Sequence, residues 1–263
     1  MMDFSKLQKH LRTYSKNDNI VNFDFCVFYN NFNVYSYKKS NRPFAKNSYN
    51  IDSVAKIICC VALMKQIQEK RLSLYDDLSI YLPISNQNIS IREFLISFLF
   101  ADSKDEIYNY TNIKKIIETC SANERYDEYI LQNIVKPLKM KSVSFFSDDD
   151  TFIAATVNDY ARFCDTIFNS GERKNRHKIL SDESVNILIN DIILKNKTDK
   201  KTIKLEANNE YIIIDTSKKI TIIFAQCTQN ISSEQFKEYA KIYELAYDGA
   251  GINTFSKGIN LFP

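Results

Sequence analysis

The chain has 263 residues, of which 44% are hydrophobic and 25% charged, and its formal net charge is +3. This length supports a buried core without disulfides, and so small a charge gives no reason to expect a nucleic-acid or membrane-surface partner. No apolar run approaches the roughly 18 residues of a membrane span, and residues 1–14 are charged and amphipathic rather than signal-like. We therefore expect a cytoplasmic protein without a membrane span.

The first part of the chain predicts a helix, a β-hairpin and a long apolar helix. Apolar residues recur at helical spacing within residues 2–14. Apolar residues then alternate on both sides of Asn30-Asn31, and asparagine tolerates the positive φ angles of a tight hairpin turn. A helix that is apolar for more than two turns is expected from Ser53 to about Lys70.

The rest of the chain predicts further helices, then a second pair of strands and a closing helix. Capping residues, proline and glycine mark the expected helix boundaries. The predicted helices are 90–100, 112–120, 124–138, 156–170, 181–191 and 233–249, with Gly171 as the expected stop after residue 170. The predicted strands lie within 210–227.

These elements predict an α+β fold. Isolated hairpins are marginally stable, so the strands from the two ends of the chain must pair in one antiparallel sheet, with a helical block inserted between them. We expect a single unit over residues 1–263, in which 1–50 and 200–263 form the sheet with its flanking helices. Residues 51–199 form the helical block.

The supply of metal-binding and acid–base residues narrows the chemistry. Six cysteines lie in apolar surroundings without a spacing suited to zinc, and the adjacent Cys59 and Cys60 are interpreted as small buried hydrophobic residues. His10 and His177 are the only histidines, so few residues are available for a Ser-His-Asp triad or for a His-rich metal site. Acid–base chemistry must then come from lysine, tyrosine or carboxylates, and we expect no cofactor and no metal.

The pattern Ser-x-x-Lys occurs twice, at Ser36/Lys39 and at Ser53/Lys56. Only the second pair lies at a predicted helix start. There, positions i and i+3 share a face, the helix N-terminus favours negative charge on the serine oxygen, and a desolvated lysine can act as a base. The alternative is structural, with Ser53 as a capping residue and Lys56 on the surface.

Several longer phrases, in this order, resemble one family. They are "YNIDSVAKIICCVALMKQIQEKRLSLYDDLSIYLP", "ISIREFLISF", "YDEYILQNIVKPLKMKSVSF" and "TVNDYARFCDTIFNSGERKNRHKILSDESVNIL". From about residue 3 to 245 the chain resembles the serine β-lactamase and penicillin-binding-protein-like hydrolases, in particular the class C and D-alanyl-D-alanine carboxypeptidase/esterase branch, as a shortened and divergent member. The resemblance implies a β-lactamase/transpeptidase-like fold, with Ser53 as the acyl-accepting nucleophile and Lys56 as its base partner.

The family's second motif, Tyr-x-Asn, is matched by Tyr110-Thr111-Asn112 directly before a predicted helix. The resemblance implies that Tyr110 relays a proton to the leaving group and that Asn112 binds the substrate carbonyl or the lysine. Otherwise these residues cap the helix. Tyr29-Asn30-Asn31 also fits the bare pattern, but it lies in the predicted hairpin turn.

The family's third motif, Lys/His-x-Gly on an edge strand, is absent. Lys204-Leu205-Glu206 occupies the expected position, so Lys204 keeps the positive charge while a glutamate replaces the glycine. The resemblance implies that the backbone N–H of Ala207 is the second oxyanion donor, beside that of Ser53. A shifted register would instead use Lys201-Thr202.

Three functional readings follow. The first is a serine hydrolase or acyltransferase that forms an acyl-enzyme on Ser53 with a small ester, amide or β-lactam-like ligand. The second is a degenerate relative that binds a small molecule or protein without turnover, favoured by the missing glycine and by Ser-Phe-Leu-Phe where the family has His-Thr-Ser-Gly. The third is an unrelated helical scaffold with two hairpins. Oligomeric state and the choice between hydrolysis and acyl transfer stay open.

Overall fold

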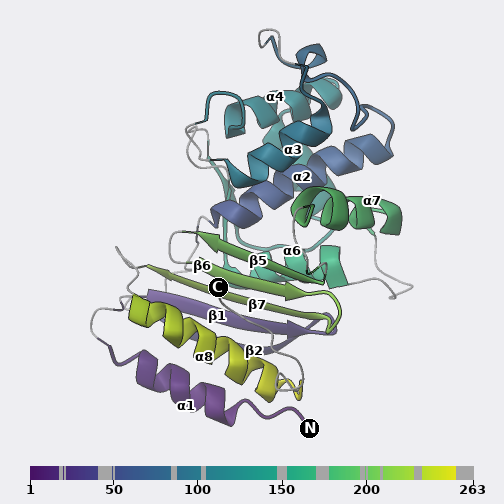
Figure 1. The fold of residues 1–263 in the computed structure, drawn as a ribbon. Coiled ribbons are helices and arrows are strands. Elements are labelled where there is room, and N and C mark those ends of the chain that lie inside the picture. Colours follow the sequence, from purple (N-terminus) through teal and green to yellow (C-terminus); the bar gives the residue numbers. More distant parts are fainter. Residues whose placement is uncertain are drawn as a thin grey trace. The chain divides into compact units, whose positions relative to one another are not determined.

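The fold was obtained as a computed structural model, which describes residues 1–17, 20, 22–40, 49, 51–83, 88–101, 105–146, 153–169, 178–195, 199, 201–207, 210–227 and 233–252. The chain divides into two compact units (Figure 1). The sheet unit comprises Met1–Tyr49, Thr156–Asn169 and Lys201–Pro263. The helical unit comprises Asn50–Ala155 and Ser170–Lys200.

The sheet unit is built on a five-stranded antiparallel sheet with the strand order β2-β1-β7-β6-β5. Strands β1 and β7 pair along their whole length, from Asn22 opposite Cys227 to Tyr29 opposite Ile220. The predicted pairing of strands from the two ends of the chain is therefore confirmed. The strands are β1 (Asn22–Tyr29), β2 (Phe32–Lys39), β5 (Thr202–Ala207), β6 (Glu210–Asp215) and β7 (Ile220–Cys227).

The turn between β1 and β2 has the predicted chemistry. Asn30 and Asn31 have φ angles of 48° and 66°, both in the left-handed region that a two-residue hairpin requires. The side chain of Asn31 also donates a hydrogen bond to Asp165 Oδ2 at 2.9 Å. This bond attaches the hairpin to helix α6 (Val157–Asn169).

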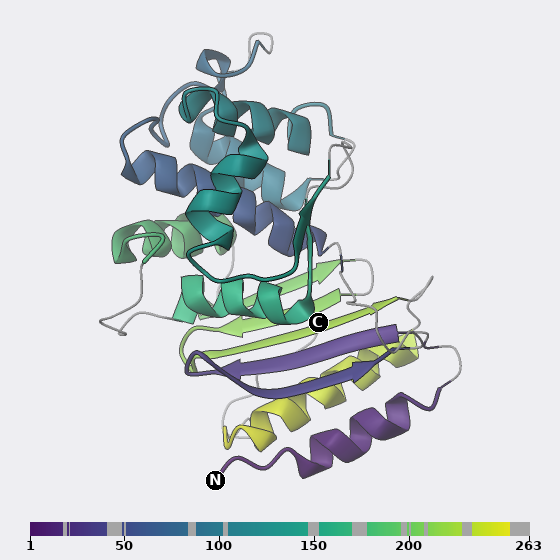
Figure 2. The ribbon, with the colours of Figure 1, turned by 180° about the vertical axis from the view of Figure 1, so that it is seen from behind.

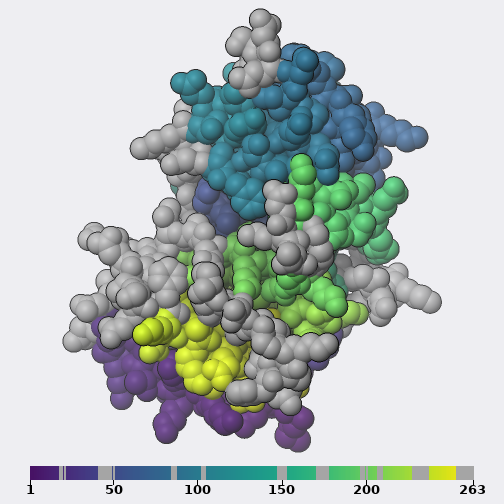
Figure 3. All heavy atoms as spheres, in the orientation of Figure 1, coloured from purple at the N-terminus to yellow at the C-terminus, as the bar shows by residue number. Residues whose placement is uncertain are grey.

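Helices cover both faces of the sheet (Figures 1 and 2). Helices α1 (Ser5–Tyr14) and α8 (Ser233–Gly249) lie side by side on one face, where their outer surfaces meet in Figure 3. Phe23, Phe25 and Val27 of β1 belong to the hydrophobic core beneath them. Cys26 faces the other way, with its Sγ 3.7 Å from the carbonyl oxygen of Val157 in α6. Successive side chains of β1 point to opposite faces of the sheet, so this strand contributes buried side chains to both faces.

Helix α2 (Asp52–Gln68) is the centre of the helical unit, and its residues from Val54 to Met64 are all buried. It contacts α3, α4, α7, η2, η3 and β4, as expected for a helix that is apolar on every side. The elements of this unit are η1 (Leu78–Ile80), α3 (Ile91–Phe100), α4 (Tyr110–Cys120), α5 (Tyr126–Ile130), η2 (Leu131–Val135), β3 (Val143–Phe145), β4 (Ile153–Ala155), α7 (Asp182–Ile187) and η3 (Leu188–Ile193). Within the described ranges, no helix is long and apolar enough to cross a membrane.

The boundaries in this unit follow local capping chemistry. Ser90 caps α3 through a reciprocal capping box with Glu93, as the Ser-x-x-Glu pattern predicts. The small two-stranded sheet of β3 and β4 was not predicted, because strands of three residues are too short for a clear period. The predicted glycine stop at Gly171 lies outside the described residues.

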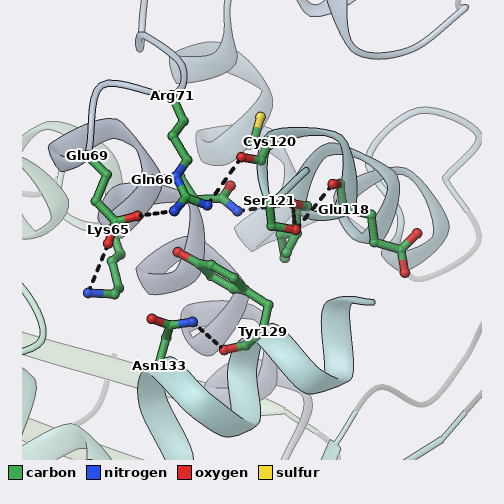
Figure 4. A network of polar contacts seen from close by, with 10 residues as sticks. Lys65, Gln66, Glu69, Arg71, Glu118, Cys120, Ser121, Tyr129 and Asn133 are labelled. Carbon is green, nitrogen blue, oxygen red and sulfur yellow. Dashed lines mark hydrogen bonds and ion pairs between the residues drawn. The ribbon is translucent and has the colours of Figure 1, made fainter. Parts of the chain in front are cut away.

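Polar contacts attach the C-terminal end of α2 to α4 (Figure 4). The buried Gln66 donates a hydrogen bond from Nε2 to the carbonyl oxygen of Ile117 at 3.0 Å. Arg71, just after α2, lies 3.5 Å from the carbonyl oxygen of Cys120 and forms an ion pair with Glu69 at 3.2 Å. These contacts fix the helix that carries Ser53 and Lys56 at its other end.

We expect Phe224→Ala to lower the free energy of unfolding by about 3–5 kcal/mol, because it removes a fully buried ring from the core of the sheet unit. The ring packs against Phe23 at 5.3 Å and Tyr239 at 4.9 Å between centroids. Urea unfolding followed by circular dichroism measures the change. Phe32→Ala in the same sheet is the control, since that side chain is 57% exposed and should cost within about 0.5 kcal/mol. Equal losses would contradict the assignment of the core.

Candidate active site

Ser53 lies in the first turn of α2. The helix is capped by the backbone of Ile51, whose carbonyl oxygen accepts hydrogen bonds from Val54 N and Ala55 N at 3.0 and 2.9 Å. Ser53 is therefore not the capping residue that the structural alternative required. Its Oγ is buried and has no hydrogen-bond partner among the described residues. Because an unsatisfied buried hydroxyl is costly, this oxygen is a candidate for a functional role.

Lys56 lies one turn further along α2 and is 4% exposed. Its Nζ donates a hydrogen bond to the carbonyl oxygen of Ala101 at 2.6 Å and lies 3.4 Å from Asp52 Oδ2. The same atom lies 5.7 Å from the centre of the Phe98 ring, within the range of a cation–π contact. Lys56 is thus buried and has several interaction partners. The alternative in which Lys56 lies on the surface is therefore wrong.

Tyr110 reaches the same turn of α2 from another helix. It is 1% exposed, and its hydroxyl donates to Asp52 Oδ1 at 2.7 Å and lies 3.2 Å from the Asp52 carbonyl oxygen. Its ring meets Phe98 edge to face at 5.4 Å. The structure therefore brings Tyr110 and Lys56 together around Asp52.

The placement of Tyr-x-Asn directly before a helix was wrong, because the helix α4 begins at Tyr110 itself. The side chain of Asn109 accepts a hydrogen bond from Asn112 N at 2.9 Å and so starts the helix two residues earlier than predicted. Asn112 Nδ2 donates to the carbonyl oxygens of Ile107 and Glu106 at 2.8 and 3.2 Å. Both amide protons of Asn112 are thus used by the preceding loop.

Lys204 and Ala207 lie on β5, the edge strand of the sheet unit, opposite Ile213 and Glu210 of β6. The Lys204 side chain is exposed. Ser53, Lys56 and Tyr110 belong to the helical unit, so the expected cooperation of β5 with them stays a prediction.

The other patterns in the sequence fall in unsuitable places. Ser36 and Lys39 lie in strand β2, where Ser36 Oγ lies 3.1 Å from Asn33 Oδ1. Tyr29-Asn30-Asn31 is the end of β1 and the hairpin turn, as expected. His177 lies outside the described residues.

Asp52 is the residue of this site that sequence reasoning missed. The sequence predicts a helix that begins one residue later, at Ser53, whereas the structure makes Asp52 the first residue of α2 and the common partner of Lys56 and Tyr110. One signal was available. A carboxylate four residues before a lysine on a helix is a favourable ion-pair spacing.

The described cysteines are poor candidates for a nucleophile. Burial raises the pKa values of the thiols of Cys26, Cys59, Cys60 and Cys164, and that of Cys120 to about 11, where nearby Asp76 adds to the effect. These five are buried and free, which confirms the interpretation of Cys59 and Cys60 as buried hydrophobic residues. Among the described residues, no group of three or more His, Cys, Asp or Glu side chains is arranged to hold a metal ion.

Comparison with known proteins gives similarity in structure but not in sequence. No protein-family profile matches the chain, and no curated protein sequence matches it. A penicillin-binding protein homologue from Caulobacter crescentus superposes with a TM-score of 0.75 at 8% identity, covering 94% of this chain and 97% of that one. EstCE1, a hydrolase with promiscuous acyltransferase activity, gives 0.72 at 10% identity, with 93% and 99% covered.

A third solved structure also superposes on this chain. The D-stereospecific amidohydrolase from a Streptomyces species gives a TM-score of 0.66 at 13% identity, covering 94% of this chain and 99% of that one. The chain therefore has the fold of the β-lactamase and penicillin-binding-protein-like serine hydrolases. The predicted fold class is confirmed.

We expect Cys120 to react slowly with a thiol reagent in the folded protein. With a pKa of about 11, only about one Cys120 thiol in a thousand is ionised at pH 8. Because the thiolate is the reactive form, the rate of modification should rise about tenfold per pH unit up to pH 10. Peptide mass spectrometry after timed exposure to iodoacetamide measures this rate. Cys120→Ser serves as the control, and complete modification at pH 8 as fast as in urea would contradict the burial.

Proposed function

We propose that the chain is a serine hydrolase or acyltransferase that forms an acyl-enzyme on Ser53 with small ester or amide substrates. The observation that carries the proposal is the arrangement of side chains at the first turn of α2. A buried serine oxygen without a hydrogen-bond partner lies there, one turn from a buried lysine, and Tyr110 reaches the same turn. The fold shared with serine hydrolases supports the same conclusion.

In the proposed reaction, Ser53 Oγ attacks the carbonyl carbon of the substrate. Its proton passes to the leaving group by way of Lys56 and Tyr110, and the bond between the carbonyl carbon and the leaving group breaks. Water then releases the acyl group as an acid, or another nucleophile takes it up. The N–H of Ser53, which lies at a helix start, is the proposed donor to the oxyanion.

The substrate class follows from the sequence of the edge strand β5. Lys204 keeps a cation there, but Glu206 replaces the glycine that would let a peptide or β-lactam carboxylate approach the strand. A small neutral ester or amide makes no use of that carboxylate site. Two structural neighbours are described as a hydrolase with acyltransferase activity and as an amidohydrolase, which is in keeping with such substrates.

A specific observation favours a second candidate, a binding protein without turnover. Lys56 Nζ is bonded to Ala101 and Asp52, and Tyr110 is bonded to Asp52, while Ser53 Oγ has neither of them as a partner. A site arranged in this way retains the fold of an acylating enzyme without an activated serine.

The proposal predicts a covalent adduct that depends on Ser53. Intact-protein mass spectrometry after incubation with a fluorophosphonate, and separately with a penicillin, should show a mass increase in the wild type that is absent in Ser53→Ala. Lys56→Ala should slow the reaction about 10²–10⁴-fold, the range typical of general acid–base groups.

Ser36→Ala is the matched control, because Ser36 has the same Ser-x-x-Lys pattern but lies on a strand. It should be labelled like the wild type. An adduct that persists in Ser53→Ala would eliminate the mechanism, and the absence of any adduct with both reagents would favour the binding protein.

A further inference from the structure

The carboxylate of Asp52 occupies the centre of the proposed site. One oxygen, Oδ1, accepts the hydrogen bond of the Tyr110 hydroxyl at 2.7 Å, and the other, Oδ2, lies 3.4 Å from Lys56 Nζ. Its side chain is 34% exposed, against 5% for that of Lys56. Asp52 also precedes Ser53 directly in the chain, so the carboxylate and the serine oxygen are carried by the same turn of α2.

This arrangement sets Asp52 and Ser53 in competition. The Tyr110 hydroxyl has one proton and donates it to the Asp52 carboxylate, while Lys56 is directed to Asp52 and to the carbonyl oxygen of Ala101. Hydrogen bonds to an ionised carboxylate are stronger than those to a neutral hydroxyl. The unpartnered state of Ser53 Oγ is the expected result.

We propose that Asp52 is a positioning residue that limits the reactivity of Ser53 by holding Tyr110 and Lys56 away from its oxygen. The inference rests on the proposed function, since it assigns the rate of that reaction to one carboxylate. An amide at position 52 is a weaker acceptor and carries no charge to attract Lys56. Asp52→Asn therefore releases both groups to bond with Ser53 Oγ and to relay its proton to the leaving group.

The test is the second-order rate constant for fluorophosphonate labelling of Ser53, measured by intact-protein mass spectrometry. We expect Asp52→Asn to react about tenfold faster than the wild type or more, the gain that corresponds to losing one charge-assisted hydrogen bond. Asp52→Glu restores the carboxylate and should return the rate toward that of the wild type. Damage to the fold lowers a labelling rate, so an increase is not explained by a structural role.

Two further variants locate the effect. Asp182→Asn is the matched control, because Asp182 forms an ion pair with a lysine four residues away, Lys178, in the same unit but with its side chain 74% exposed. It should leave the rate unchanged. In a Tyr110→Phe background, Asp52→Asn should accelerate labelling less than it does in the wild type, because part of the effect passes through the Tyr110 hydroxyl.

The outcomes separate the inference from the function on which it rests. If the wild type is labelled at Ser53 and Asp52→Asn is labelled no faster, the role of Asp52 is overturned and the hydrolase stands. If neither protein is labelled, both are overturned. If the wild type is inert and Asp52→Asn is labelled in a Ser53-dependent way, the role of Asp52 is supported, and the hydrolase is overturned in favour of the binding protein. Should Asp52→Asn fail to fold by circular dichroism, Asp52→Ser is judged by the same criteria.

Discussion

The burial of α2 on every side is the constraint on which the rest of the helical unit depends. An apolar helix can be surrounded by other helices at little cost, but each polar group that it carries must then find a partner inside the protein. Gln66 at one end meets this requirement with its Nε2, which donates to a backbone carbonyl of α4, while its Oε1 has no partner among the described residues. Lys56 at the other end meets it with the Ala101 carbonyl and the Asp52 carboxylate, since a buried charge is tolerated only when it is paired.

Ser53 Oγ, like Gln66 Oε1, has no hydrogen-bond partner among the described residues, but of the two only Ser53 lies on the turn that Tyr110 reaches. The serine oxygen is buried without a partner on a turn where Lys56 and Tyr110, the two proposed proton-transfer groups, are both engaged by Asp52. Proteins commonly accept local instability where a site needs a reactive group. The stability of the Lys56 and Tyr110 contacts and the reactivity of the serine are thus opposed through one carboxylate.

The sheet unit shows how far a fold can persist while its sequence changes. Residues from both ends of the chain pair in one antiparallel sheet, and 93–94% of the chain superposes on solved structures at 8–13% identity. A fold supports many functions, so the chemistry of this chain has to be argued from its own residues. Those residues differ from the resembled motifs at two places, the Glu206 that stands where a glycine is expected and the Ser-Phe-Leu-Phe that stands where His-Thr-Ser-Gly is expected.

Local signals in the sequence were sufficient for the helices, for the Asn30-Asn31 turn and for the spacing of Ser53 and Lys56, because periodicity, capping and turn chemistry act over a few residues. The partners within the site were decided only by tertiary structure. Asp52 meets a hydroxyl 58 residues away, and Lys56 meets a carbonyl 45 residues away. No local pattern encodes such contacts, since they arise from the packing of α2 against α3 and α4. The same packing, and not the Tyr-x-Asn pattern, directs Tyr110 to the serine turn.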